Sequence, residues 1–162
     1  MDVRVNSATA ADELVLRNLG ELYSYDFSAI TRAELGPHGR YDYDFFGSCD
    51  GERRTAYLVW VDSALAGFAI VARGSRLRED AAVWDMAEFF VVRRWRRQGV
   101  GAQVAATLFA RHPGRWEVRE RVGNEAARAF WRAAIGGFTG GRFGEEEIDD
   151  DRWRGWVQRF EA

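Results

Sequence analysis

The sequence predicts an α+β fold in which helices flank one central mixed sheet, most of whose strands are antiparallel. Apolar residues make up 47% and charged residues 30% of the 162-residue chain, a composition typical of a folded soluble protein. Alternating and helix-periodic segments follow one another as strand, helix, three-strand meander, helix, strand, helix and two strands. No repeat, linker or low-complexity segment interrupts this order, so we expect residues 1–162 to form a single domain.

The N-terminal elements are a short strand and a helix. Residues 3–5 (VRV) alternate as a strand, and Ser7 or Thr9 supplies a helix cap. The apolar positions that follow recur at helical spacing: Leu14, Leu16, Leu19 and Leu22. This periodicity predicts a helix that ends near Tyr25.

The middle of the chain is a three-strand meander. It follows residues 26–51, where helix and strand signals are weak. This segment contains a turn and the aromatic, acidic stretch RYDYDFFG at 40–47. Residues 54–61 and 65–72 flank a short turn and predict a β-hairpin. Residues 83–92, rich in aromatic and branched side chains, predict the third strand after a polar loop.

The C-terminal part alternates helices and strands. Residues 99–112 are apolar at Val100, Val104 and Leu108, and Pro113 ends this helix. A strand at 116–120 precedes a helix that begins at the cap Asn124 and stops at Gly136-Gly137. Two final strands are predicted at residues 142–148 and 152–160.

The stretch RRWRRQGVGA joins the third strand of the meander to the next helix and combines arginines with glycines. A glycine-rich turn into a helix exposes backbone N–H groups at the positive end of the helix dipole, a favourable site for phosphate. Gly99 and Gly101 let an anion approach the main chain, and Arg96 and Arg97 add forked donors. The alternative is a tight helix start with solvated arginines, since no Gly-Lys-Ser/Thr follows and a third glycine is missing.

Charge and cysteine content narrow the class of protein. The net charge of −2 and the acidic stretch 145–151 argue against nucleic acid as a partner, although Trp95 among its arginines offers a base-stacking alternative. All 23 basic residues are arginine, so an arginine cluster is less informative here than usual. Cys49, His38 and His112 lack metal-ligand spacing, so we expect no metal. Without a membrane-length apolar run or a signal-peptide pattern, we expect no membrane partner and a cytoplasmic location.

The ordered elements and motifs together resemble the GNAT superfamily of N-acetyltransferases. The motif Arg96-x-x-Gly99-x-Gly101 lies between the fourth strand and the next helix, Asn124 opens the last helix, and Gly137-Phe138 follows it. The resemblance implies fourth and fifth strands that splay apart and bind acetyl-CoA as a cosubstrate. It also implies transfer of the acetyl group to a primary amine of a small molecule or peptide. A homodimer is compatible with this assignment.

By position, the resemblance implies a set of cofactor-binding residues. The backbone amides that would hold the pyrophosphate are those of Gln98, Gly99, Val100, Gly101 and Ala102, with Arg96 and Arg97 beside them. The main chain that would pair with the pantetheine arm belongs to Phe90, Val91 and Val92. Asn124 would lend its side-chain amide to the cofactor, or act as a helix cap alone. Trp131 would face the thiol end of the cofactor or pack in the core.

Glu88 is the candidate catalytic base. It lies inside the otherwise apolar strand MAEFFVV, where an unpaired carboxylate facing the core would be costly. In the resembling family a glutamate on this strand often accepts the amine proton, directly or through water. The alternative is an edge residue on a half-exposed sheet, because the sequence does not fix the face to which Glu88 points.

Trp131 departs from the family pattern, in which many members place a tyrosine as general acid for the departing thiolate. An indole donates a hydrogen bond but does not give up its proton at neutral pH, so this role is not transferred. Either another group or water supplies the proton, or the chain is a non-catalytic acyl-CoA-binding module. The tyrosines that lie in the variable region are Tyr23, Tyr25, Tyr41 and Tyr43.

The acceptor site is expected around the first helix and the segment after it. Tyr23, Asp26, Tyr41 and Tyr43 are the candidate residues, because aromatic faces with carboxylates attract a protonated amine. The alternative is that these aromatic side chains pack the first helix onto the sheet.

Overall fold

The computed structural model of the chain describes residues 1–44, 46 and 49–162. Among these residues seven strands form one sheet in the order β1-β2-β3-β4-β5-β7-β6, in which only the β4–β5 pair is parallel. The strands are β1 (Val3–Ser7), β2 (Arg54–Val61), β3 (Ala64–Arg73), β4 (Trp84–Val91), β5 (Arg115–Arg121), β6 (Phe143–Asp149) and β7 (Arg154–Glu161). The α-helices are α1 (Glu13–Thr31), α2 (Val100–Arg111) and α3 (Glu125–Thr139). The predicted mixed, mostly antiparallel sheet flanked by helices is confirmed.

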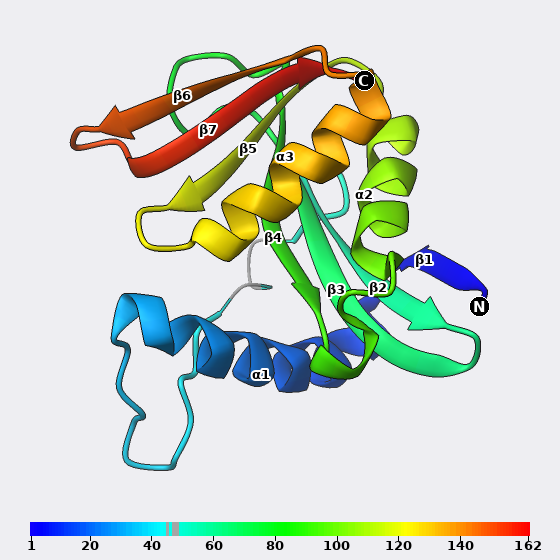
Figure 1. Ribbon diagram of the computed structural model, residues 1–162. Coiled ribbons are helices and arrows are strands. Elements are labelled where there is room, and N and C mark those ends of the chain that lie inside the picture. The colour runs from blue at the N-terminus through cyan, green and yellow to red at the C-terminus, as the bar shows by residue number, and fades with distance from the viewer. Residues whose placement is uncertain (45, 47–48) are drawn as a thin grey trace.

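The helices lie on opposite faces of the sheet (Figure 1). Helix α1 covers one face, where Leu16 and Leu19 pack in a core cluster with Phe68 and Phe90. Helices α2 and α3 cover the other face, and their buried side chains form the larger core cluster: Val104, Leu108, Trp131 and Ile135 with residues of the sheet. The alternation of strand side chains thus separates an α1 layer from an α2/α3 layer.

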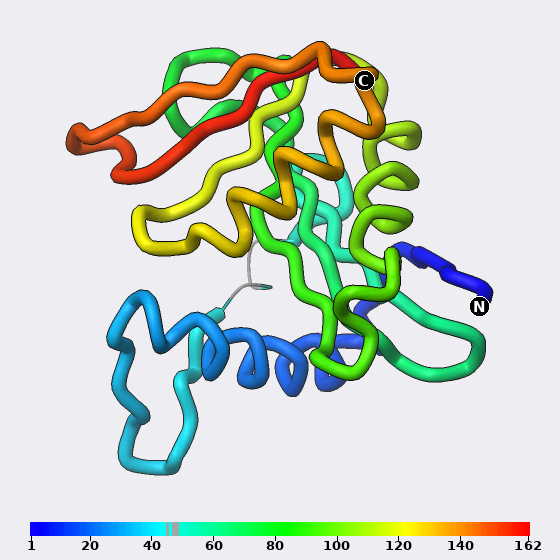
Figure 2. Tube along the Cα trace, in the orientation of Figure 1, coloured from blue at the N-terminus to red at the C-terminus, as the bar shows by residue number. Residues whose placement is uncertain are grey.

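Strands β4 and β5 pair only at their N-terminal ends. The parallel register joins Trp84 to Trp116 and Asp85 to Glu117, and it extends no further. Beyond these positions the two strands diverge toward α1 (Figure 2). The predicted splay of the fourth and fifth strands is therefore confirmed, and one main-chain edge of β4 is left without a neighbouring strand over most of its length.

A β-bulge interrupts β4 within this unpaired part. Ile70 of β3 pairs with Glu88 and Val71 pairs with Met86, so Ala87 is an extra residue on β4. A bulge bends its strand and changes the face to which the following side chains point. It sets the direction of Glu88, which the sequence pattern did not determine.

Two helices extend further than the sequence predicts. Helix α1 continues past Tyr25 to Thr31, because Phe27 packs beside Tyr23 with ring centroids 5.3 Å apart and Arg32 ends the helix in the left-handed conformation. Helix α3 continues through Gly136-Gly137 to Thr139, so the predicted stop is wrong. Gly140 provides the left-handed end, with φ 64° and its N–H donating to the Gly136 carbonyl.

A buried polar cluster lies between α3 and the β5–β7–β6 part of the sheet. Glu120 of β5 is 2% exposed, and neither carboxylate oxygen accepts a hydrogen bond from another of the described residues. The guanidinium of Arg128 stacks on the Trp156 ring at 3.3 Å and donates to Glu145 at 2.7 Å. The cluster therefore combines one paired carboxylate with one unpaired carboxyl group.

Candidate active site

Glu88 faces α1 and meets the side chain of Tyr23. The Tyr23 hydroxyl donates a hydrogen bond of 2.9 Å to Oε2 of Glu88. The nearest guanidinium nitrogen of Arg54, from the start of β2, lies 4.0 Å from Oε1. The Glu88 side chain is 16% exposed, so the carboxylate reaches solvent while most of it is enclosed. The structure thus resolves the face of Glu88: it points into the α1 layer and is held by a phenol.

At Glu88, burial and the neighbouring groups shift the pKa in opposite directions. Burial raises the pKa of Glu88 above the usual range of a glutamate, while the Tyr23 hydrogen bond and the charge of Arg54 oppose the rise. Burial, followed by the charge of Glu88 and the hydrogen bond to it, raises the pKa of Tyr23 well above its usual range. In the hydrogen bond between them the phenol is the donor and Oε2 of Glu88 the acceptor.

Tyr23 packs against residues of β3 and β4 on the side of the sheet that α1 covers. Its ring makes edge contacts with Phe68 and Phe90, with centroids 5.7 Å and 5.8 Å away. The charge of Arg121, at the end of β5, is near enough to lower the pKa of Tyr23, and Glu88 approaches from β4. The phenol therefore lies on the α1 side of the sheet, next to Glu88 on the part of β4 that does not pair with β5.

The other predicted acceptor residues lie in different settings. Asp26 forms ion pairs with Arg93 and Arg96 rather than lining the surroundings of Glu88. The main-chain N–H of Tyr41 donates to Glu21 at 2.9 Å, which ties the segment after α1 back to that helix. Tyr43 is 62% exposed and close enough to act on the pKa of Tyr23.

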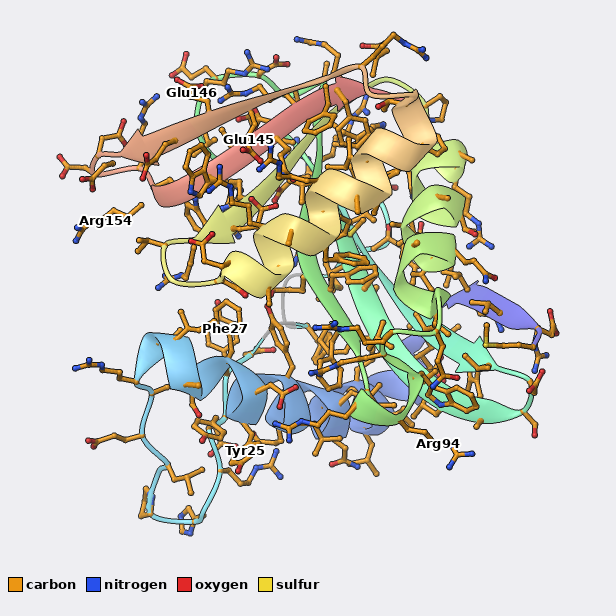
Figure 3. The ribbon with its side chains drawn as sticks, in the orientation of Figure 1. Tyr25, Phe27, Arg94, Glu145, Glu146 and Arg154 are labelled. Carbon is orange, nitrogen blue, oxygen red and sulfur yellow. The ribbon has the colours of Figure 1, made fainter. Side chains whose placement is uncertain are left out.

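Two residues of the aromatic stretch 40–47, Phe45 and Gly47, lie outside the described residues. Within α1, Figure 3 shows Phe27 pointing toward the loop between β5 and α3, whereas Tyr25 points away from the sheet. The side of α1 that faces the splayed strands is therefore lined by aromatic rings.

The predicted phosphate loop opens α2. Gly99 is the residue before the helix and adopts φ 81°, and Arg97 is also left-handed at φ 61°. A side chain at Gly99 would meet a single neighbour, the Gln103 amide nitrogen at 3.8 Å, so the space beside the loop is open. The first N–H groups of a helix have no partner within it. Gln98 and Ala102 are exposed, while Val100 is fully buried and anchors the turn.

Gly101 has a different role from Gly99. It lies inside α2 with its Cα facing the ring of Phe130, and an added Cβ would lie 3.0 Å from that ring and 3.7 Å from Phe89. Close helix–helix packing therefore accounts for this glycine, and the sequence alone does not separate that cause from anion binding.

Arg96 joins the loop to both β4 and α1. Its Nε donates to the Val91 carbonyl at 2.6 Å, and its guanidinium also bonds the Asp26 carboxylate. Arg93 donates to the other oxygen of Asp26 at 2.8 Å. Arg97 remains exposed beside the start of α2. Of the two predicted phosphate arginines, Arg96 is engaged with the protein and Arg97 faces solvent.

Successive main-chain N–H groups of β4 point alternately toward β3 and toward the edge of β4 that has no neighbouring strand. The Val92 N–H donates to the Ala66 carbonyl at 2.8 Å, so Val92 and, two residues earlier, Phe90 direct their N–H groups toward β3. Phe89 and Val91 consequently direct theirs toward the unpaired edge. Among the three predicted residues Phe90, Val91 and Val92, Val91 has the main chain that a ligand in the splay can reach.

Asn124 and Trp131 have structural roles on α3. The Asn124 side-chain oxygen accepts a hydrogen bond from the Ala127 N–H at 3.2 Å, as a helix cap does. Trp131 is 5% exposed and contacts Phe89 and Phe130 with centroids 4.8 Å and 4.9 Å away. Its indole thus packs in the core directly behind the unpaired edge of β4.

Sequence reasoning did not single out Arg54 or Arg121 near the Glu88–Tyr23 pair. Arg54 lies at the start of β2 and Arg121 at the end of β5, so the fold alone brings them beside one carboxylate and one phenol. No spacing in the sequence indicates either contact.

Comparison with known proteins assigns the family. The model of the acetyltransferase (GNAT) family matches residues 19–136, which include most of α1, the loop before α2 and most of α3. The chain therefore belongs to the GNAT family of acetyltransferases. No curated protein matches it in sequence.

Solved structures share the fold along the whole chain. An acetyltransferase from Thermus thermophilus has a TM-score of 0.73 at 16% identity, covering 100% of this chain and 98% of that one. The aminoglycoside acetyltransferase AAC(6')-Ib, in complex with coenzyme A, has a TM-score of 0.72 at 11% identity and coverages of 99% and 95%. The Vibrio cholerae spermidine N-acetyltransferase, in complex with CoA and spermine, has a TM-score of 0.66 at 9% identity and coverages of 98% and 95%.

None of the helices in the described part of the chain is both long and apolar enough to cross a membrane. Within the same residues no three His, Cys, Asp or Glu side chains form a group suited to a metal ion.

Proposed function

We propose that this protein transfers the acetyl group of acetyl-CoA to a primary amine of a small molecule or peptide, with Glu88 as the general base. The observation that carries the proposal is the mostly enclosed Glu88 carboxylate, held by Tyr23 beside the unpaired edge of β4. A carboxylate in that place is within reach of an amine that approaches a thioester lying along the edge.

The fit of acetyl-CoA is supported by the loop and by the strand edge. The open space beside Gly99 and the free N–H groups at the start of α2 suit a pyrophosphate. Arg97 adds a cation at the surface of the loop. The unpaired edge of β4, with the main chain of Phe89 and Val91, suits an extended arm that pairs as an added strand.

Glu88 then removes the proton that the amine nitrogen loses as it attacks the carbonyl carbon. Its raised pKa brings the carboxylate closer to the operating pH, which improves a general base. The Val91 N–H, directed away from β3, is the donor that we assign to the developing oxyanion.

An amine acceptor is supported by the aromatic lining of α1. Tyr23 packs against Phe68 and Phe90 of the sheet, and Phe27 points toward the loop between β5 and α3 (Figure 3). Aromatic faces attract protonated amines. The solved structures of similar fold include enzymes named for spermidine and for aminoglycosides, both of which are amines. We place the acceptor between α1 and the end of β5.

The test is a thiol-release assay with acetyl-CoA and a panel of polyamines, aminoglycosides, amino acids and peptides, with mass spectrometry of each product. We expect thiol release that depends on one class of amine and an acetylated product of that amine. Calorimetric binding of acetyl-CoA without release for any amine would contradict the proposal and favour an acyl-CoA-binding module.

A further inference from the structure

We propose that Tyr23 is the acid that protonates the departing thiolate, in place of the tyrosine that Trp131 replaces. The inference rests on the proposed acetyl transfer and adds a catalytic residue to it. It is carried by the 2.9 Å hydrogen bond from Tyr23 to Glu88, which places the phenol beside the part of β4 that does not pair with β5.

Position is the first argument. Tyr23 comes from α1, and its ring is fixed by edge contacts with Phe68 and Phe90. Its hydroxyl group donates to Glu88, which lies on the part of β4 that does not pair with β5. A thioester held along the edge of β4 would present its sulfur to this same space.

The state of the phenol is the second argument. Burial raises the pKa of Tyr23 well above its usual range, so the hydroxyl carries its proton at neutral pH and is available as a donor when the thiolate leaves. Arg121 lowers that pKa and favours the phenolate that proton transfer leaves behind.

The other residues that could protonate the thiolate lie in less suitable positions. Trp131 is buried against Phe89, and an indole gives up no proton at neutral pH. Tyr57 lies on β2, where its hydroxyl is 2.7 Å from the His112 ring nitrogen. Tyr25 is 64% exposed and points away from the sheet. Tyr41 and Tyr43 belong to the segment after α1.

Glu88 and Tyr23 together account for the protons that move in the proposed reaction. The acceptor, bound as an ammonium ion, first releases one proton to solvent. The neutral amine nitrogen then forms a bond to the carbonyl carbon, and a second proton passes from it to the Glu88 carboxylate. The carbon–sulfur bond breaks, and the sulfur takes the proton of the Tyr23 hydroxyl. The resulting phenolate recovers a proton from the Glu88 carboxyl along their hydrogen bond. The products are the acetylated amine and the free thiol, and both side chains return to their starting states.

The experiment compares Tyr23→Phe with the control Tyr25→Phe, two residues along the same helix. Tyr23→Phe keeps the ring contacts and removes only the oxygen. We expect kcat to fall roughly 10²-fold or more for Tyr23→Phe, with acetyl-CoA affinity unchanged, and no change for Tyr25→Phe. Equal kcat values for Tyr23→Phe and the parent would overturn the inference.

A pH profile separates an acid from a residue that only positions Glu88. The Tyr23 hydrogen bond lowers the pKa of Glu88, so its loss shifts the acidic limb of the profile to higher pH. If Tyr23 only tunes Glu88, the activity of Tyr23→Phe recovers above the shifted limb, which would refute the acid role. We expect the rate to stay low throughout.

A second variant keeps the test valid if Tyr23→Phe does not fold. Fluorotyrosine at position 23 preserves the side chain and makes the phenol a stronger acid, so kcat measured at one fixed pH should rise. The same replacement at position 25 should leave kcat unchanged. An unchanged kcat for position 23 contradicts the inference. Absence of thiol release from the parent with every amine contradicts the proposed function itself.

Discussion

Glu120→Gln should make the protein less sensitive to alkaline pH. Glu120 faces Arg128 of α3 and Glu145 of β6, with Arg119 beside it on β5, and it is 2% exposed. Burial first, and then the charge of Glu145, raise the pKa of Glu120 from 4.5 to about 8. The neutral acid is thus the form that the folded protein accommodates.

The direction of the effect follows from this rise in pKa. Because the folded state holds the proton more tightly than the unfolded chain, the stability contributed by that proton is fully present below pH 4.5. It is lost as the pH rises through about 8. At about 1.4 kcal/mol per pKa unit, the rise limits the loss in free energy of unfolding to about 5 kcal/mol.

The assay is urea unfolding of the parent, Glu120→Gln and the control Glu147→Gln at about pH 5 and about pH 9. Glu147 is an exposed residue of β6, so its variant should follow the parent. We expect Glu120→Gln to lose less stability than the parent between the two pH values, by several kcal/mol. Parallel losses in the parent and Glu120→Gln would refute the assignment of a buried neutral acid.

Two further predictions concern the glycines and the core tryptophan. Gly101→Val should lower the free energy of unfolding by about 1–3 kcal/mol through its clash with Phe130, measured by denaturation. Gly99→Val should also lower stability, because valine is strained at φ 81°, and the folded variant should bind coenzyme A more weakly, measured by calorimetry. Unchanged affinity for folded Gly99→Val contradicts the phosphate loop. Trp131→Ala should cost about 3–5 kcal/mol in the same denaturation assay, and Trp131→Tyr should leave kcat nearly unchanged because Tyr23 supplies the proton. A marked rise in kcat for Trp131→Tyr would contradict that explanation.

The order and type of the elements could be predicted because the local signals agree with the fold. Strand alternation and turn residues fixed β2, β3 and β4 to within a residue or two, and Asn124 marked the start of α3 through its capping side chain. The ends of α1 and α3 could not be predicted from the sequence. Packing of Phe27 in α1 and of Ile135 in α3 extends each helix beyond the last residue that helical periodicity or a stop signal indicates.

The site could be predicted only in part. The glycine loop is formed by residues that are adjacent in the sequence, so its position before α2 could be predicted. The face of Glu88 depends on the bulge at Ala87, and the role of Gly101 depends on Phe130 of another helix. Such contacts arise between elements distant in the chain, and one sequence does not encode them as a pattern.

The rate of acetyl transfer by Glu88→Gln tests the central claim most directly. The measurement is kcat/KM for the parent and the variant from about pH 5 to about pH 9, with an amine that the panel identifies, alongside acetyl-CoA affinity. We expect the parent's rate to decline as the pH falls through a carboxyl pKa above the usual 4.5, and the variant to be slower by roughly 10²-fold or more with unchanged affinity. Equal rates and equal pH profiles for the two proteins would contradict Glu88 as the base.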